Sequence, residues 1–284
     1  MTVLIALGAA MTYGLSDVVG GAASRRTSAW PVATVSAATA LVAALAIALL
    51  LPGTPSTTDL LWGALAGIGN GAGAGFLYRG LASGRMGVVG PVSGVGAAAI
   101  PVIVGVLTGE RPAALVWAGI LVAAPAIWLV AREPRPDVSS EEVHRPGLAA
   151  GLLDGVLAGC GFGLVFSALG QVEQASGYWP VALSQAVGVP TVILLALAVG
   201  GSAVPRHRSE LHGGMVSGVL SATALVGFLV ATQQGLLAVS AVLTSLYPAG
   251  TVLLAAVVLH ERVHRIQAVG LTLCAVCVTL VALG

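Results

Sequence analysis

The sequence predicts an all-helical integral membrane protein with ten transmembrane helices in two inverted five-helix repeats. Of its 284 residues, 57% are hydrophobic and only 8% are charged, whereas soluble domains carry about 25% charged residues. Its apolar runs repeatedly reach the ~20 residues that a helix needs to cross a bilayer. These two observations exclude an ordinary soluble enzyme, and a third, the similarity of the two halves, indicates the repeats.

Charged, proline and glycine residues divide the chain into ten candidate spans. The first five are 2–21, 30–51, 60–78, 87–107 and 112–130. The second five are 148–169, 179–200, 213–232, 239–259 and 265–283. Between them lies a polar stretch with seven charged side chains, so we expect a first repeat at 1–131, a linker at 132–147 and a second repeat at 148–284.

The two halves align without gaps over short stretches. Shifted by 149 positions, 30–33 (Trp-Pro-Val-Ala) falls on the same four residues at 179–182, and Tyr13 falls on Phe162. Shifted by 151, Glu110 and Arg111 fall on Glu261 and Arg262. This pattern indicates an internal duplication. Because each repeat has an odd number of helices, the second copy must enter the membrane from the opposite side, as in many secondary transporters.

The arginines predict the orientation in the membrane. The loops after the first, third, fifth, seventh and ninth spans carry eleven of them, and the other face carries Arg111 alone. These eleven are Arg25, Arg26, Arg79, Arg85, Arg132, Arg135, Arg145, Arg206, Arg208, Arg262 and Arg265. The positive-inside rule places these loops in the cytoplasm and both termini outside a multi-pass cytoplasmic membrane protein.

Several motifs recur in the order and spacing of a known family. They are Tyr13-Gly14, 84–93 (GRMGVVGPVS), 109–112 (GERP), 245–255 (SLYPAGTVLLA), 260–262 (HER), Gln267 and Gly270. With them the chain resembles the ten-helix EamA-type branch of the drug/metabolite transporter superfamily. The resemblance implies two five-helix repeats around a central cavity, transport of small metabolites and frequent coupling to a proton gradient. Such transporters usually keep both termini in the cytoplasm and have basic residues after the second helix, which this chain lacks.

Polar residues within the spans are the candidates for a substrate path. Asp17 and Asp154 are the carboxylates, and a charge inside a membrane is costly unless it faces water or a partner. We consider two roles for them, either interfacial acids or groups that bind a proton or a substrate ammonium beside Arg79. The further candidates are Tyr13, Asn70, Tyr78, Ser93, Gln185, Thr244 and Tyr247. Such groups can line a path, but they can also bond to their own helix or join neighbouring helices.

Other conspicuous residues are interpreted as structural. Glu110 and Glu261 precede the fifth and tenth spans, where a carboxylate suits the positive end of a helix. Gly67, Gly71 and Gly75 repeat every four residues, which predicts one close helix contact. The three cysteines lie in apolar runs and are expected to pack there.

We therefore expect a secondary transporter that exports a small organic metabolite or drug by alternating access, coupled to an ion or proton gradient. The alternatives are an intramembrane enzyme that uses Asp17, Asp154 and Arg79 on lipid-linked substrates, and a membrane scaffold. No catalytic constellation, cofactor motif or metal-ligand spacing is recognised. The expected partners are a small solute and the lipid bilayer, with no nucleic acid, and a homodimer is left open.

Overall fold

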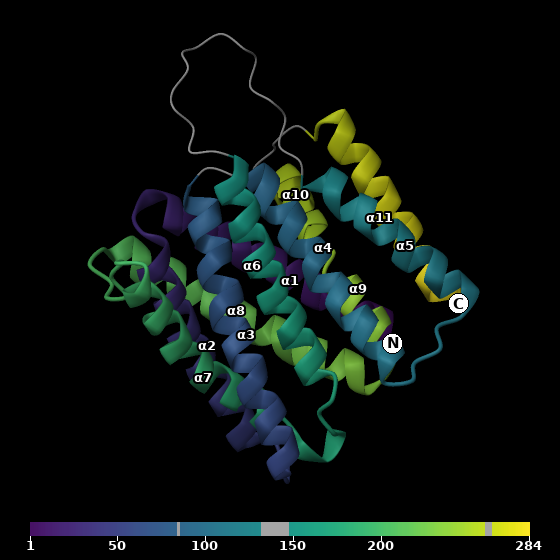
Figure 1. Cartoon of the computed structure of the whole chain (residues 1–284), viewed down its shortest axis with the longest axis horizontal. Coiled ribbons are helices and arrows are strands. Elements are labelled where there is room, and N and C mark those ends of the chain that lie inside the picture. Colours follow the sequence, from purple (N-terminus) through teal and green to yellow (C-terminus); the bar gives the residue numbers. More distant parts are fainter. Residues whose placement is uncertain (84–85, 132–147, 259–262) are drawn as a thin grey trace.

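The computed structural model describes residues 1–83, 86–131, 148–258 and 263–284, and every regular element within these ranges is a helix (Figure 1). The first half contains α1 (Thr2–Arg26), α2 (Ala29–Leu50), α3 (Thr57–Ala82), α4 (Met86–Leu107) and α5 (Ala114–Val130). The second half contains α6 (Leu148–Leu169), the short 3₁₀ helix η1 (Gln174–Ser176), α7 (Trp179–Ala198), α8 (Arg208–Gln233), α9 (Leu237–Thr244), α10 (Tyr247–Val258) and α11 (Arg265–Leu283).

Within the described chain, nine helical segments are long and apolar enough to cross a membrane, and α5 is a shorter apolar helix. The all-helical membrane fold expected from the sequence is confirmed. The linker at 132–147 and Arg85, Glu261 and Arg262 lie outside the described residues.

The ninth expected span is not one continuous helix. It is divided into α9, which ends at Thr244, and α10, which begins at Tyr247. Pro248 has no amide hydrogen for the carbonyl of Thr244, and its ring crowds that carbonyl. At the break, the amide of Leu246 bonds to the carbonyl of Leu243, three residues before it, which makes the turn tighter than in an α-helix. Pro91, Pro101, Pro125 and Pro190 lie inside helices that continue through them.

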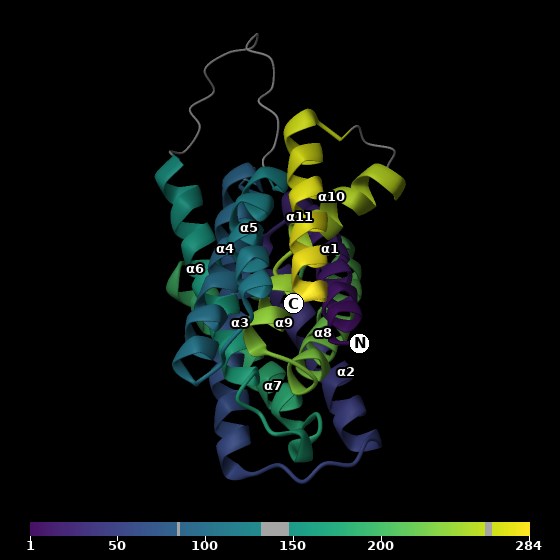
Figure 2. The same ribbon diagram turned by 90° about the vertical axis from the view of Figure 1, so that its right-hand side faces the viewer.

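Helices of one half pack on helices of the other in matching pairs (Figures 1 and 2). α1 packs on α8 and α6 packs on α3; α2 packs on α8 and α7 packs on α3. α2 also packs on α7, α4 on α9 and α5 on α11. The corresponding helices of the two halves are α1 and α6, α2 and α7, α3 and α8, α4 and α9, and α5 and α11. If each helix is replaced by its counterpart, the same set of pairs results.

Glycines make the closest of these contacts. A Cβ atom added to Gly63 or Gly67 of α3 would lie 2.6 Å or 2.5 Å from a backbone carbonyl oxygen of α7. Gly214 and Gly218, 151 residues later, contact α2 in the same way. Gly71 also faces α7, but Gly75 faces the Trp30 ring of α2. Gly67, Gly71 and Gly75 thus all make the close helix contacts expected of them, the first two with α7 and the third with α2, because α3 crosses two different helices along its length.

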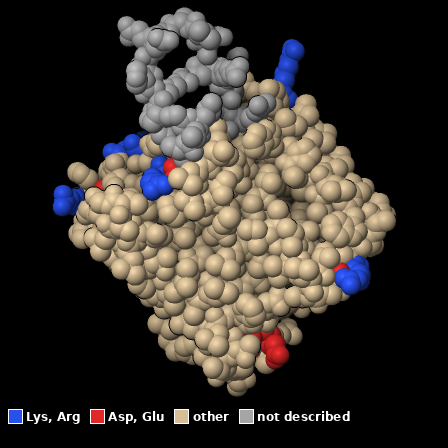
Figure 3. Space-filling model, viewed as in Figure 1, with Lys and Arg blue, Asp and Glu red and all other residues tan. Residues whose placement is uncertain are grey.

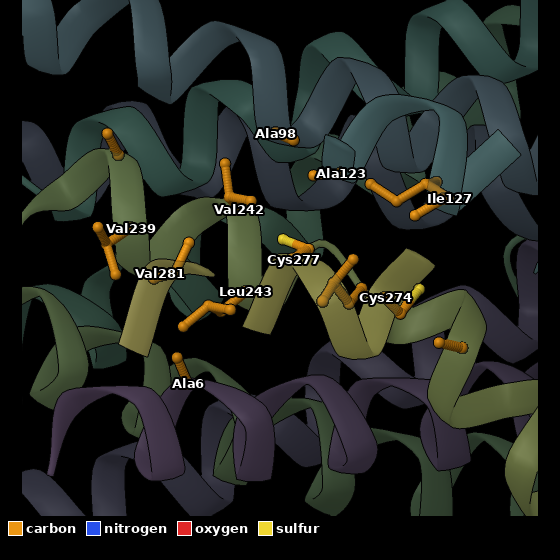
Figure 4. Close-up of a cluster of buried hydrophobic side chains, with 14 of the residues drawn as sticks. Ala6, Ala98, Ala123, Ile127, Val239, Val242, Leu243, Cys274, Cys277 and Val281 are labelled. Atoms are coloured by element: carbon orange, nitrogen blue, oxygen red, sulfur yellow. The ribbon is translucent and has the colours of Figure 1, made fainter. Parts of the chain in front are cut away.

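A large apolar cluster joins α5 and α11 to the rest of the molecule. Ile127 of α5, Val242 and Leu243 of α9, and Cys274 and Cys277 of α11 meet there (Figure 4). Both cysteines are buried and unbridged, whereas Cys160 is exposed. The packing role expected for Cys274 and Cys277 agrees with their place in this cluster.

On the face of the molecule seen in Figure 3, the described charged side chains lie near the edges. In the space-filling view most blue side chains gather toward the end where the grey atoms lie, and a red group lies at the opposite end (Figure 3). The surface between is almost free of charge in this view, as a bilayer-facing surface must be.

Candidate functional site

The inner face of α1 carries Tyr13 and Asp17. One residue turns the helix by about 100°, so Gly14, Asp17 and Gly20 follow one another around it in steps of about 60°. Gly14 lies against the α10 backbone, and Gly20 lies against the Tyr78 ring of α3. Asp17 therefore projects between α3 and α10, toward the middle of the helix bundle.

Asp17 lies among tyrosines from three helices. Tyr13 lies about one helical turn before it on α1, and the neighbouring Gly14 and Gly20 lie against Tyr247 of α10 and Tyr78 of α3. Asp17 and Tyr13 are partly exposed, whereas Tyr78 and Tyr247 are buried. These four residues, which we call the tyrosine–aspartate site, bring together α1 and α3 of the first half and α10 of the second.

Serine hydroxyls hold Tyr78 in place. Its hydroxyl bonds with the hydroxyl of Ser217 on α8. Ser16 of α1 bonds to the same Ser217 hydroxyl at 2.9 Å and donates to the Ser217 carbonyl at 3.0 Å, and the Ser36 hydroxyl of α2 lies 3.3 Å away. Four helices thus meet in one buried hydroxyl cluster, which fixes the ring on its side of Asp17.

Tyr247 is held in place by one residue of the first half and one of the second. Its hydroxyl bonds with the hydroxyl of Ser93 on α4 at 2.8 Å. Its ring lies edge-on to Phe162 of α6, with 6.5 Å between ring centroids. Because Tyr247 opens α10, the break after α9 is what places this ring next to Asp17.

Arg79 and Asp154 form an ion pair between α3 and α6. The Nε atom of Arg79 donates to Asp154 Oδ1 at 2.9 Å, and its Nη2 atom bonds to the same oxygen. The guanidinium also lies over the Phe76 ring, 4.7 Å from its centroid. Asp154 is almost fully buried and Arg79 is about one third exposed. Arg79 thus pairs with Asp154 and not with Asp17, so the two carboxylates have different surroundings.

Two further candidates meet between α3 and α7. Asn70 donates its Nδ2 hydrogen to Gln185 Oε1 at 2.8 Å. The Gln185 Nε2 atom is buried and bonds to none of the described residues. Thr244, at the end of α9, is also fully buried, and its hydroxyl has no partner in the described part of the chain.

Two carboxylates bond to other segments at the end of the bundle where α3 begins, away from the Arg79–Asp154 pair. Asp59 at the start of α3 accepts hydrogen bonds from the Ser56 and Ser176 hydroxyls and from the Glu173 amide. Glu110 accepts from the amides of Leu237 and Ala238, the first residues of α9. The helix-end role expected for Glu110 therefore belongs to α9 of the other half, and its assignment to the following helix was wrong.

One comparison with protein families gives a match to part of the chain. Residues 1–132 match the EamA-like transporter family. This match confirms the resemblance drawn from the motifs, and it indicates a membrane transporter of the drug/metabolite type. The tyrosine–aspartate site takes Tyr13, Asp17 and Tyr78 from the matched residues and Tyr247 from the part of the chain beyond them.

A solved structure, described only as the crystal structure of a protein, has the same fold. It superposes with a TM-score of 0.75 over 99% of this chain and 96% of that chain, at 16% sequence identity. No curated protein matches this chain.

Sequence reasoning missed three residues around this site. Phe162 and Phe166 of α6 lie against Tyr247 and Tyr13, and Ser217 bonds to Tyr78. The 149-residue shift carried the signal for both phenylalanines, because it places Phe162 on Tyr13 and Phe166 on Asp17. Nothing in the sequence distinguishes Ser217 from the other serines of its helix.

Proposed function

We propose that this chain is a secondary transporter that exports a small organic metabolite or drug through the centre of the bundle, driven by an ion or proton gradient. The observation that carries the proposal is the tyrosine–aspartate site. A carboxylate with no hydrogen bond or ion pair to any described residue projects into the middle of an apolar bundle, and the helices on either side of it carry tyrosines from both halves. Ionisable groups placed in this way inside membranes bind substrates or coupling ions.

Alternating access through inverted repeats is part of the proposal. The exchangeable helix pairs and the two matching glycine contacts support it. At one end of the bundle, the Arg79–Asp154 ion pair joins α3 to α6. At the other end, Asp59 joins the loop between α2 and α3 to the loop between α6 and α7. Opening each end in turn would require one of these contacts to break while the other persists.

The enzyme alternative finds less support in the geometry. It needs Asp17, Asp154 and Arg79 to act in one polar site, but Asp154 and Arg79 bond to one another. Their mutual neutralisation leaves Asp17 as a single carboxylate, without a described acid, base or phosphate-binding partner in contact with it.

The experiment compares the small molecules inside and outside cells that express wild type, Asp17→Asn or Glu173→Gln at equal membrane levels. Glu173 is an exposed carboxylate in a loop and serves as the matched control. We expect wild type and Glu173→Gln to redistribute the same solute, and Asp17→Asn to lose this activity. Dissipating the proton gradient should slow the export. Profiles identical to those of empty cells for all three proteins would refute transport.

A further inference from the structure

We propose that the tyrosine–aspartate site binds the charged nitrogen of an organic monocation, an amine or a quaternary ammonium compound. This inference rests on the proposed function and adds the chemical class of its substrate. Asp17 would neutralise the cation, and the rings of Tyr13, Tyr78 and Tyr247 would surround it.

The first argument is that Asp17 alone among the buried and partly buried carboxylates of the described residues lacks a hydrogen-bond or ion-pair partner. Asp154 pairs with Arg79, and Asp59 accepts from two hydroxyls and an amide. Glu110 caps α9, and Glu210 accepts from the amides of Arg206 and His207. The fold thus satisfies the other carboxylates it buries, and leaves one in the centre available to a ligand.

The second argument is the aromatic wall. Tyr13 lies 6.2 Å from Phe166, and Phe166 lies 4.3 Å from Phe228, measured between ring centroids. Phe162 extends the wall to Tyr247. The faces of such rings carry negative potential and attract cations, most strongly where water is excluded. The aromatic rings and the Asp17 carboxylate therefore both favour a ligand with a positive charge.

The third argument is what the site lacks among the described residues. Arg79 on α3, the arginine that the sequence placed beside the two carboxylates, is engaged by Asp154 and the Phe76 ring. An anion would meet the Asp17 carboxylate with no compensating cation. A zwitterion would leave its own carboxylate unpaired in the same apolar surroundings, which is costly. A compound with one positive charge and an apolar body fits best.

Binding to the purified full-length protein tests this inference with four compounds of similar shape. They are choline, its neutral isostere 3,3-dimethylbutan-1-ol, zwitterionic glycine betaine and anionic 3,3-dimethylbutanoate; benzyltrimethylammonium adds a larger cation. A ligand that binds the folded state raises the unfolding temperature. We expect choline or benzyltrimethylammonium to raise it for wild type and Glu173→Gln, and the other three compounds to leave it unchanged.

Variants locate the binding. Asp17→Asn should weaken the apparent Kd for the cation by about tenfold or more, because it removes the neutralising charge. Asp17→Glu should retain most of the affinity, which separates loss of charge from loss of fold. Tyr13→Phe should bind as wild type does because it keeps the ring, whereas Tyr13→Leu should bind several-fold more weakly.

Two results would overturn the inference: no stabilisation by either cation, or equal cation affinity in wild type and Asp17→Asn. Flux in proteoliposomes keeps the two proposals apart. Asp17-dependent cation binding without flux would reject transport and leave the binding site standing. Flux of a neutral or anionic solute, with no cation binding, would reject the monocation and leave transport standing.

Discussion

Asp17 and Asp154 show how the surroundings decide the role of a buried carboxylate. Asp154 has a guanidinium in contact and almost no exposed surface, so its charge is compensated within the protein. Asp17 keeps some exposed surface and has no described partner, so its charge must be compensated from outside or removed by a proton. The difference follows from packing, because α6 and not α1 brings its carboxylate to Arg79.

The Arg79–Asp154 contact predicts a measurable coupling. Asp154→Asn or Arg79→Ala should each lower the free energy of unfolding by about 1–3 kcal/mol, since removing one partner leaves the other poorly solvated. The exposure of Arg79 keeps this below the cost for a fully buried pair. The double variant should be less destabilised than the sum of the two, by at least about 0.5 kcal/mol, in unfolding measurements of the purified protein. Strict additivity would show that the contact contributes nothing.

The candidate residues were predictable from the sequence only as a set. Polar side chains are rare in the spans, so Asp17, Tyr78, Arg79, Asp154 and Tyr247 stand out on composition alone. Which of them bond to one another depends on the neighbours of each helix. Two acids at similar expected depth were equally good partners for Arg79 until the packing of α6 on α3 was known.

At the scale of the element, the glycines of α3 set the distance to α7. Gly67→Ala places a Cβ atom 2.5 Å from the Ser184 carbonyl oxygen and 2.6 Å from Val187 Cβ. Because both atoms belong to a packed helix, we expect a loss of about 1–3 kcal/mol of stability. The matched control is Gly8→Ala in α1, where no atom lies within 4 Å of the added carbon. Gly8→Ala should be neutral or slightly stabilising, since alanine is the better helix former.

If both alanine variants unfold at the wild-type temperature, α3 and α7 are less closely packed than the structure places them. Unfolding temperatures of the two purified variants in the same detergent make the comparison direct.

The short helix α9 depends on a residue from the other half. Glu110→Ala should cost about 1–2 kcal/mol, because it leaves the amides of Leu237 and Ala238 without their acceptor. Hydrogen exchange should speed up at these two amides first, while the exposed control Glu173→Ala should leave their exchange unchanged. Unaltered exchange in Glu110→Ala would contradict the cap.

The break before α10 marks where sequence reasoning about elements stopped. Five prolines lie beyond the first turn of an expected span, and four of them leave their helices continuous. The lengths of the apolar runs therefore sufficed to place the helices, but not to choose the proline that interrupts one. That choice depends on neighbours such as Ser93, which bonds the Tyr247 hydroxyl from another helix.

At the scale of the whole molecule, the run lengths and the duplication in the sequence were enough to predict an all-helical bundle of two related halves. The pairing of α1 with α8 and of α3 with α6 was not predictable, since it depends on contacts between residues far apart in the chain. Ser16 and Ser217 are 201 positions apart, and Arg79 and Asp154 are 75 positions apart. The arginine distribution adds an orientation that remains a prediction.

Two loop positions at opposite ends of α7 test that orientation. Glu173 lies before α7 and Val204, which is 65% exposed, lies after it. We replace Cys160, Cys274 and Cys277 by alanine and introduce either Glu173→Cys or Val204→Cys. The positive-inside rule predicts that a membrane-impermeant thiol reagent labels Glu173→Cys in intact cells, and Val204→Cys only after permeabilisation. The opposite labelling would place the arginine-rich end outside and both termini in the cytoplasm, and Arg79–Asp154 would then close the outer end of the path.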